Sequence, residues 1–176
     1  LAFVNKMDIT GANFDNAVRM MHERLKANAV PIELPIGSEA DFKGVVDLVA
    51  NHAIIYKDEL GVNVEIIDIP DDMKEIAEEA RTTLIEAVSD FDDTIMEEFL
   101  DGKEITAEEL KPAIRKATIA LKMVPVLCGS SYRNKGVQNL LDAIVEYLPS
   151  PLDIPSIEGV NPKTDKEELR HSSDSE

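Results

Sequence analysis

Apolar positions along the chain form two short strand-like runs, each followed by a polar loop and a stretch with helical spacing. The first run is Leu1–Val4, which is typical of a strand buried on both faces and which stops at the polar residues 5–8. Asn13 suits a helix cap, and apolar residues recur at helical spacing after it through about residue 28: Phe14, Val18, Met21 and Leu25. This pattern predicts a strand–loop–helix unit over residues 1–28.

The same pattern returns near the end of the chain. Val124–Leu127 is typical of a buried strand, and residues 128–136 form a polar, glycine-containing loop. A helix is predicted by the apolar positions that follow: Val137, Leu140, Leu141, Ile144 and Leu148. The polar tail over residues 149–176 contains several prolines, so we expect a linker that ends in a frayed terminus.

The segment between these two units changes from strand-like to helical patterning. The turn Asp58–Gly61 separates two β-rich runs and predicts antiparallel neighbours. From residue 71 apolar residues recur at helical spacing, a short helix is expected over residues 92–100, and Thr106–Glu109 matches the capping box that begins a third helix. The β-rich runs cover residues 30–36, 44–49, 52–56 and 62–69. Strands followed by helices predict an α+β module within residues 29–122.

The charge of the chain is strongly negative and unevenly placed. A formal net charge of −17 argues against a nucleic-acid-binding surface, because such surfaces need clustered Lys and Arg. Almost the whole imbalance lies in residues 58–109, which hold 19 acidic and 3 basic side chains. These positions are either solvated helical faces or a surface for a basic partner protein, and the sequence leaves both interpretations open.

Other features exclude several classes of protein. No apolar run approaches the roughly 18 residues that cross a bilayer, and no signal-like segment precedes the first strand, so we expect a cytoplasmic protein without a membrane partner. The single Cys128 follows an apolar run and is expected to be a buried strand residue rather than a reactive thiol. His22 and His52 have no acidic or cysteine partner at ligand spacing, so no metal site is predicted.

Both polar loops follow predicted buried strands, which is where ligands bind in open α/β sheets. Selecting guanine over adenine requires acceptors for the N1–H and N2 amino groups and a donor for O6. Asp8 offers two acceptor oxygens, whereas Asn5 and the backbone N–H groups of the loop 128–136 can donate. Adenine would leave the Asp8 carboxylate desolvated and unpaired, so this residue would favour guanine by a few kcal/mol.

The two loops resemble known GTPase motifs. Residues 5–8, Asn-Lys-Met-Asp, match the Asn-Lys-x-Asp of the fourth guanine motif. Residues 128–137, together with 140–142 and 147–155, resemble the fifth guanine motif, last helix and exit linker of bacterial elongation factor G. In that family an α+β subdomain called G′ is inserted between the motifs, and this sequence resembles it at Leu34–Gly37, Phe42–Asp47 and Phe91–Asp92. The resemblance covers the whole chain.

This resemblance implies an α/β fold: the C-terminal part of a P-loop GTPase-type, Rossmann-like G domain with an inserted α+β subdomain. Residues 1–28 and 123–148 would belong to the G domain, residues 29–122 to G′, and residues 149–176 to a linker toward the next domain. The two guanine-motif strands would lie side by side. The other neighbour of the first strand would be absent, and we expect this open apolar edge to pair with another molecule or with the C-terminal tail.

The resemblance also implies how GTP or GDP would be held. Asp8 would bind the N1 and N2 groups of guanine, Asn5 would support the base and the loop, and the Lys6 methylenes would lie against the ring. Ser130 and Ser131 would close over O6. The family usually has alanine where this chain has Ser131, and because that residue acts through its backbone N–H, we expect the contact to survive.

Sequence elements for hydrolysis are missing. No Gly-rich loop ending in Gly-Lys-Ser/Thr is present, and the pair Gly102-Lys103 is followed by Glu104. Asp-x-x-Gly patterns at Asp8 and Asp41 belong to the guanine motif and to the strands of the insert, not to a Mg²⁺ loop. The chain starts without methionine, and we expect a fragment without catalytic residues that does not hydrolyse GTP, whereas the full-length protein would use Mg²⁺.

For the full-length protein the resemblance implies the GTPase that catalyses ribosomal translocation of tRNA and mRNA, with the ribosome as its partner. A ribosome-protection or peptide-release-factor type of translational GTPase is the alternative, because both share the guanine motifs. In the family, G′ contacts the C-terminal domain of the ribosomal stalk protein. The acidic helices within residues 71–109 are therefore expected to bind the stalk, and the isolated chain is alternatively a protein-interaction module.

Overall fold

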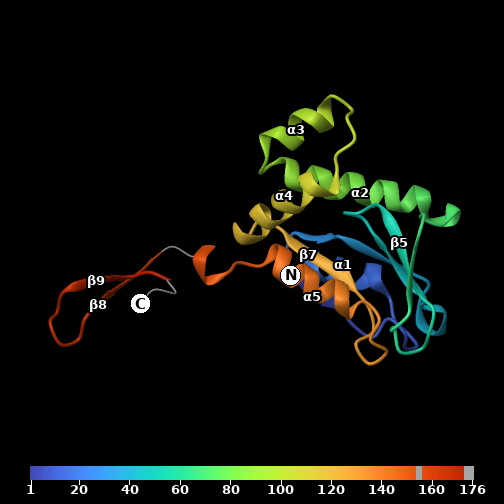
Figure 1. The fold of residues 1–176 in the computed structure, drawn as a ribbon, viewed down its shortest axis with the longest axis horizontal. Coiled ribbons are helices and arrows are strands. Elements are labelled where there is room, and N and C mark those ends of the chain that lie inside the picture. Colours follow the sequence, from blue (N-terminus) through green and yellow to red (C-terminus); the bar gives the residue numbers. More distant parts are fainter. Residues whose placement is uncertain (154–155, 173–176) are drawn as a thin grey trace.

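The computed structural model describes residues 1–153 and 156–172 and contains three sheets and five α-helices in those ranges (Figure 1). A small parallel sheet and an antiparallel sheet share one continuous apolar core, and two helices of the insert pack against the parallel sheet. The mixed α/β architecture agrees with the fold class predicted for a G-domain segment with an inserted subdomain.

The parallel sheet brings together the strands of the two predicted strand–loop–helix units. It has the strand order β1 (Ala2–Val4), β7 (Val124–Cys128) and β2 (Ala29–Pro31), so the strands that precede the two polar loops are direct neighbours. Ala2 faces Val126 in a parallel register, which aligns the carboxyl ends of β1 and β7. The expectation that the two guanine-motif strands lie side by side is confirmed.

One predicted strand is divided between two sheets. The run over residues 30–36 forms β2 in the parallel sheet and β3 (Glu33–Ile36) in the antiparallel sheet. Ile32 is the junction, because its N–H donates to the Val126 carbonyl at 2.9 Å while its own carbonyl accepts from the Leu48 N–H at 3.0 Å. The parallel sheet therefore continues to Pro31, beyond the predicted start of the insert at residue 29. Alternation alone predicts a strand but not its partner.

Two helices follow the strands of the guanine loops. Helix α1 (Phe14–Leu25) begins at Asn13, whose side-chain oxygen accepts from the Asn16 N–H at 2.8 Å, as the sequence predicts. Helix α5 (Val137–Tyr147) begins at Gly136, which has a φ of 78°. A side chain there would be strained by the backbone and would press on the Cys128 carbonyl, so the turn from loop to helix requires glycine.

The antiparallel sheet has the order β3-β4-β5-β6, with β4 (Gly44–Asp47), β5 (His52–Tyr56) and β6 (Val64–Ile67). The predicted antiparallel pairing across residues 58–61 is confirmed by the β5–β6 register. Asp58 shapes this turn by accepting hydrogen bonds from three backbone N–H groups, those of Leu60, Val62 and Asn63. Such a turn is typical of an Asp that caps its own loop.

The helical half of the insert consists of α2 (Lys74–Ser89), α3 (Asp93–Leu100) and α4 (Ala107–Ile119). The capping box predicted from Thr106 and Glu109 is present, and Asp92 caps α3. Helix α4 packs against α5 and β7, while α2 packs against β2, so the insert covers the parallel sheet. The described residues also include three short 3-10 helices: Glu39–Asp41, Asp71–Met73 and Pro151–Asp153.

Arg81 on α2 joins three segments of the insert. One terminal nitrogen donates to the carbonyls of Leu48 and Val49, the latter at 2.9 Å, and the other donates to the Ile105 carbonyl at 2.6 Å. Lysine cannot reproduce this fork. We expect Arg81→Lys to lower the free energy of unfolding by about 2 kcal/mol, measured by urea denaturation. Arg24→Lys on the exposed face of α1 is the control, and equal effects of the two changes would contradict this role.

The tail contains regular structure that the sequence did not predict. Residues Ile157–Val160 (β8) and Glu167–Arg170 (β9) form an antiparallel hairpin, which lies away from the rest of the fold in Figure 1. The assignment of residues 149–176 as a linker stays a prediction, and the expected frayed end falls on residues 173–176, which, like residues 154–155, lie outside the described ranges. In the described residues β1 pairs only with β7, and β8 and β9 form a separate sheet, so the expected pairing of the β1 edge with the tail is wrong as far as residue 172. The pairing of β1 with another molecule stays a prediction.

Among the described residues, no helix is both long enough and apolar enough to cross a membrane. The buried position predicted for Cys128 is confirmed: it is the last residue of β7 and lies within the core. Burial raises the pKa of its thiol, which keeps it in the unreactive neutral form.

Candidate guanine-binding site

The loops after β1 and β7 are hydrogen-bonded to each other along their backbones. The Gly129 N–H donates to the Val4 carbonyl and the Met7 N–H donates to the Gly129 carbonyl, both at 3.0 Å. Gly129 is required for this approach, because a Cβ there would clash with the Lys135 carbonyl and lie 2.8 Å from the Phe3 ring. The two motifs are thus held as one surface at the carboxyl ends of the strands.

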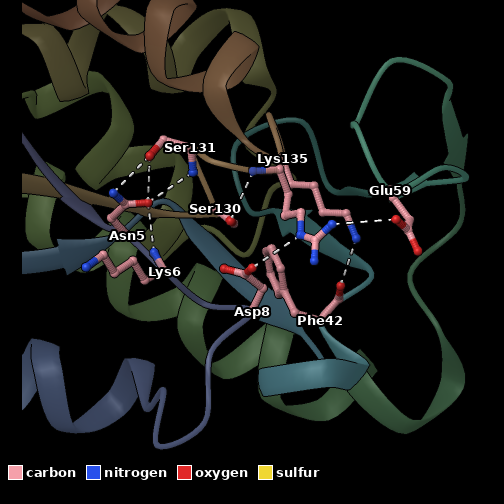
Figure 2. A network of polar contacts seen from close by, with 9 residues as sticks. Asn5, Lys6, Asp8, Phe42, Glu59, Ser130, Ser131 and Lys135 are labelled. Atoms are coloured by element: carbon pink, nitrogen blue, oxygen red, sulfur yellow. Dashed lines mark hydrogen bonds and ion pairs between the residues drawn. The ribbon is translucent and has the colours of Figure 1, made fainter.

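Asn5 links the two motifs through its side chain (Figure 2). Its carbonyl oxygen accepts from the Ser131 N–H at 3.0 Å, and its amide donates to the Ser131 hydroxyl at 3.0 Å. The same carbonyl oxygen accepts from the Lys6 N–H at 2.8 Å, which stabilises Lys6 at the unusual φ of 63°. Asn5 therefore joins the loop after β1 to the loop after β7, while its role at the base stays a prediction. The Lys6 residue itself is exposed.

Asp8 lies beside this junction with its carboxylate only partly exposed. A side-chain hydrogen bond with Ser130 lowers the pKa of Asp8, and the nearby charges of Arg133 and Lys135 lower it further. The carboxylate is consequently ionised at neutral pH and presents acceptor oxygens. Arg133 Nε lies 3.7 Å from Asp8 Oδ2, close enough for an ion pair but too far for a hydrogen bond.

The backbone N–H groups of Ser130 and Ser131, which were expected to lie against O6 of guanine, instead form hydrogen bonds within the two loops. The Ser130 N–H donates to the Lys135 carbonyl at 2.9 Å, and the Ser131 N–H is donated to Asn5. Tyr132 is different, because its N–H has no acceptor within the described structure and the residue is 87% exposed. The contact of the two serines with O6 stays a prediction, and Tyr132 is the next residue along the loop with a free donor.

The insert contributes residues that sequence reasoning missed. Lys135 Nζ donates to the Phe42 carbonyl at 3.2 Å, and Arg133 Nη1 lies 3.5 Å from Glu59 Oε2, as Figure 2 shows around Glu59 and Phe42. On the other side, the Gly11 N–H donates to Glu39 Oε1 at 2.7 Å. The only sequence signal for these contacts was the basic character of residues 133 and 135, and this does not identify the groups of the insert that they contact. Both guanine loops are therefore braced by the insert.

The remaining candidates lie apart from this surface. His22 is on α1 and His52 on β5, and the described part of the chain contains no group of three or more His, Cys, Asp or Glu arranged to hold a metal ion. Gly102 and Lys103 lie in the connection between α3 and α4, where the Gly102 N–H donates to Phe99 and the Lys103 N–H to Glu98. These N–H groups are not arranged as a phosphate cradle.

Comparison with known proteins agrees with this geometry. Residues 1–150 match the family model of the elongation factor Tu GTP binding domain. This chain belongs to that family. The elongation factor Tu GTP-binding domain family consists of translational GTPase domains, so membership places this chain among the translational GTPases.

Among solved structures, a crystal structure of a Thermus thermophilus protein is similar to this GTP-binding-domain segment, with a TM-score of 0.72 and 27% sequence identity. The match covers 88% of this chain and 23% of the other chain. The chain thus spans less than a quarter of the length of that protein, and the remaining three quarters of that chain have no counterpart in the match.

Proposed function

We propose that this chain is the guanine-recognition segment of an elongation factor G type of translational GTPase, which in its complete form moves tRNA and mRNA through the ribosome. The observation that supports this most directly is the Asn5–Ser131 junction with Asp8 beside it, formed by two motifs that are separated by a large insert. A ribosome-protection or peptide-release-factor type is the alternative. Translocation of tRNA by the purified complete protein, measured against tetracycline rescue and peptide release, separates the three.

In this proposal the base is recognised from two sides. The Asp8 carboxylate accepts hydrogen bonds from the N1 and N2 groups of guanine, and the Lys6 methylenes lie against the ring. The exposed Tyr132 N–H donates to O6 together with the loop that Ser130 and Ser131 form. Adenine carries an amino group where guanine has O6. This amino group is itself a donor and cannot accept from the N–H groups of the loop, and adenine would also leave the Asp8 carboxylate unpaired.

The chemistry of the phosphates belongs to other residues of the complete protein. The printed sequence has neither a Gly-Lys-Ser/Thr phosphate loop nor the Mg²⁺ ligands of a GTPase. We therefore propose that this segment binds the base of GTP or GDP, that it has no hydrolytic activity by itself, and that Mg²⁺ is held elsewhere in the parent. Turnover of GTP by the isolated chain at the rate of a complete GTPase would reject this division of labour.

Base recognition can be tested by NMR titration of the chain with nucleosides, which do not need a phosphate site. Guanosine should shift the amide signals of Lys6 and Tyr132 more strongly than adenosine does. Asp8→Asn should weaken guanosine binding about tenfold and favour xanthosine, because an amide NH₂ can donate to the oxygen that xanthine carries at C2.

Asp15→Asn is the matched control, because Asp15 is an exposed carboxylate on the neighbouring helix α1 and does not contact the loops. It should leave guanosine binding unchanged. Equal shifts with guanosine and adenosine in the unaltered chain would count against the proposed base site.

A second proposal concerns the acidic surface of α2. Its exposed side chains follow one another at helical spacing: Glu75, Glu78, Glu79 and Glu86. We propose that this face binds a basic partner, with the C-terminal domain of the ribosomal stalk protein as the candidate. Titration with that domain should shift α2 signals, and the shifts should weaken with salt. The absence of any shift on α2 at low salt would reject this partner.

A further inference from the structure

Arg133 lies between two carboxylates that come from different parts of the fold. Its Nε is 3.7 Å from Asp8 Oδ2 in the fourth guanine motif, and its Nη1 is 3.5 Å from Glu59 Oε2 in the β5–β6 turn of the insert. Figure 2 labels Asp8 and Glu59 and marks both ion pairs with dashed lines. Neither distance is a hydrogen bond, so the guanidinium is shared rather than fixed on one partner.

The turn that carries Glu59 is held firmly against the fifth guanine motif. Gly61 has a φ of 59°, and a side chain there would clash with the Asn134 carbonyl and lie 3.0 Å from the Arg133 carbonyl. Asp58 fixes the same turn from within through its hydrogen bonds to backbone N–H groups, including that of Asn63 at 2.7 Å. The position of Glu59 relative to Arg133 is therefore set by backbone packing and not only by a surface ion pair.

Asp8 needs both carboxylate oxygens to pair with the N1–H and N2 amino groups of guanine. A cation beside Oδ2 lowers the acceptor strength of that oxygen and occupies space next to the base. Glu59 attracts the same cation in the opposite direction. Tyr132 is a third partner for Arg133, because the guanidinium carbon of Arg133 lies 5.8 Å from the centre of the Tyr132 ring.

We propose that Arg133 is a movable counter-ion that competes with guanine for Asp8, and that Glu59 of the insert sets the strength of this competition by drawing Arg133 away. This inference rests on the proposed role of Asp8 in reading guanine. It makes Arg133 and Glu59 positioning residues of the base site, and it gives the inserted subdomain a direct influence on nucleotide affinity. Arg133 is 41% and Glu59 90% exposed at the side chain, so effects of about two- to fivefold are expected.

The first test needs no nucleotide. The pKa of the Asp8 carboxyl is followed by ¹³C NMR in the whole chain, in Glu59→Gln and in Arg133→Gln. Removing Glu59 should leave Arg133 to pair with Asp8 alone and lower the pKa of Asp8, whereas removing Arg133 should raise it. An unchanged Asp8 pKa in Glu59→Gln would overturn the sharing of Arg133.

The second test measures guanosine affinity by NMR titration of the same variants. Glu59→Gln should weaken guanosine about two- to threefold, Arg133→Gln should strengthen it, and the double variant should bind like Arg133→Gln, because Glu59 acts only through Arg133. Glu65→Gln is the control, since Glu65 lies on β6 and pairs with Lys57. Weaker binding in Arg133→Gln, or an equal effect of Glu59→Gln with and without Arg133, would overturn the competition.

The two tests separate this inference from the proposed function. If the unaltered chain does not prefer guanosine over adenosine, the proposed base site fails and the competition with guanine falls with it, whatever the Asp8 titration gives. If guanosine is preferred but neither Asp8 titration nor affinity responds to Glu59→Gln, only the role of Arg133 and Glu59 is rejected.

Discussion

Replacing Glu33 with glutamine should remove most of the loss of stability that we expect for the unaltered chain between about pH 5 and pH 8. Glu33 is 2% exposed on β3, and burial, with a smaller contribution from the charge of Asp47, raises the pKa of this carboxyl to about 8. The folded state therefore keeps the proton while the unfolded state loses it near the ordinary pKa. The free energy of unfolding falls as pH rises through this interval, by about 3 to 4 kcal/mol.

The substitution fits the site. Glu33 accepts hydrogen bonds from the Asn139 side-chain amide on α5 and from the Cys128 N–H on β7 at 3.4 Å. A glutamine keeps the acceptor for Cys128, and Asn139 can turn its amide to accept from the new NH₂ group. Glutamine carries no charge at any pH, so no desolvated carboxylate forms at pH 8.

Urea unfolding of both proteins at several pH values between 5 and 8 measures the effect, with Glu86→Gln on the exposed face of α2 as the control. The unaltered chain and the control should become less stable with rising pH, while Glu33→Gln should stay nearly level. A common slope in all three proteins would show that Glu33 does not hold a proton in the folded state.

The second large effect is expected from Gly129→Ala. The added methyl group would clash with the Lys135 carbonyl, and it would lie 2.8 Å from the Phe3 ring on β1. Backbone cannot move aside here without breaking the hydrogen bonds of Gly129 to Val4 and Met7. We expect a loss of about 3 kcal/mol in the free energy of unfolding and a loosened Asn5–Ser131 junction.

Thermal or urea unfolding gives the stability, and the amide signal of Ser131 reports on the junction. Gly159→Ala on β8 is the matched control, because a Cβ there would meet nothing within 4 Å and its φ is also outside the left-handed region. It should change stability by a few tenths of a kcal/mol at most. A Gly129→Ala protein as stable as this control would mean that the two loops approach less closely than described.

Several elements follow from local sequence and were predicted correctly. The cap of α1 at Asn13 and the capping box at Thr106 depend on side chains that bond their own backbone a few residues away. The turn at Asp58–Gly61 is likewise formed by residues adjacent in sequence. The position of Asn5 and Asp8 after an apolar strand was sufficient to place them at the carboxyl edge of a sheet, although the expectation that this strand is buried on both faces is wrong, because β1 lies at the edge of the sheet and is only half-buried.

Longer-range contacts were decided by the tertiary structure. Pattern alone did not divide residues 30–36 between two sheets, because an apolar residue is buried equally well against either. Nor did it predict the hairpin β8–β9, whose pairing joins residues in a polar tail. The burial of Glu33 was also missed, because one acidic residue in a predicted strand does not indicate that α5 and β7 pack around its side chain.

The sequence by itself determined the chemistry of the proposed base site: an amide and a carboxylate after one strand, and a loop of serines and glycines after another. Only the tertiary structure decided how that chemistry is arranged. The packing of the insert placed Glu59 beside Arg133, which also lies near Asp8, and the fold of the loop after β7 left Tyr132 with the free N–H. The physical reason is distance along the chain. Hydrogen bonds within a few residues are encoded locally, whereas contacts between segments far apart in the sequence depend on how whole elements pack.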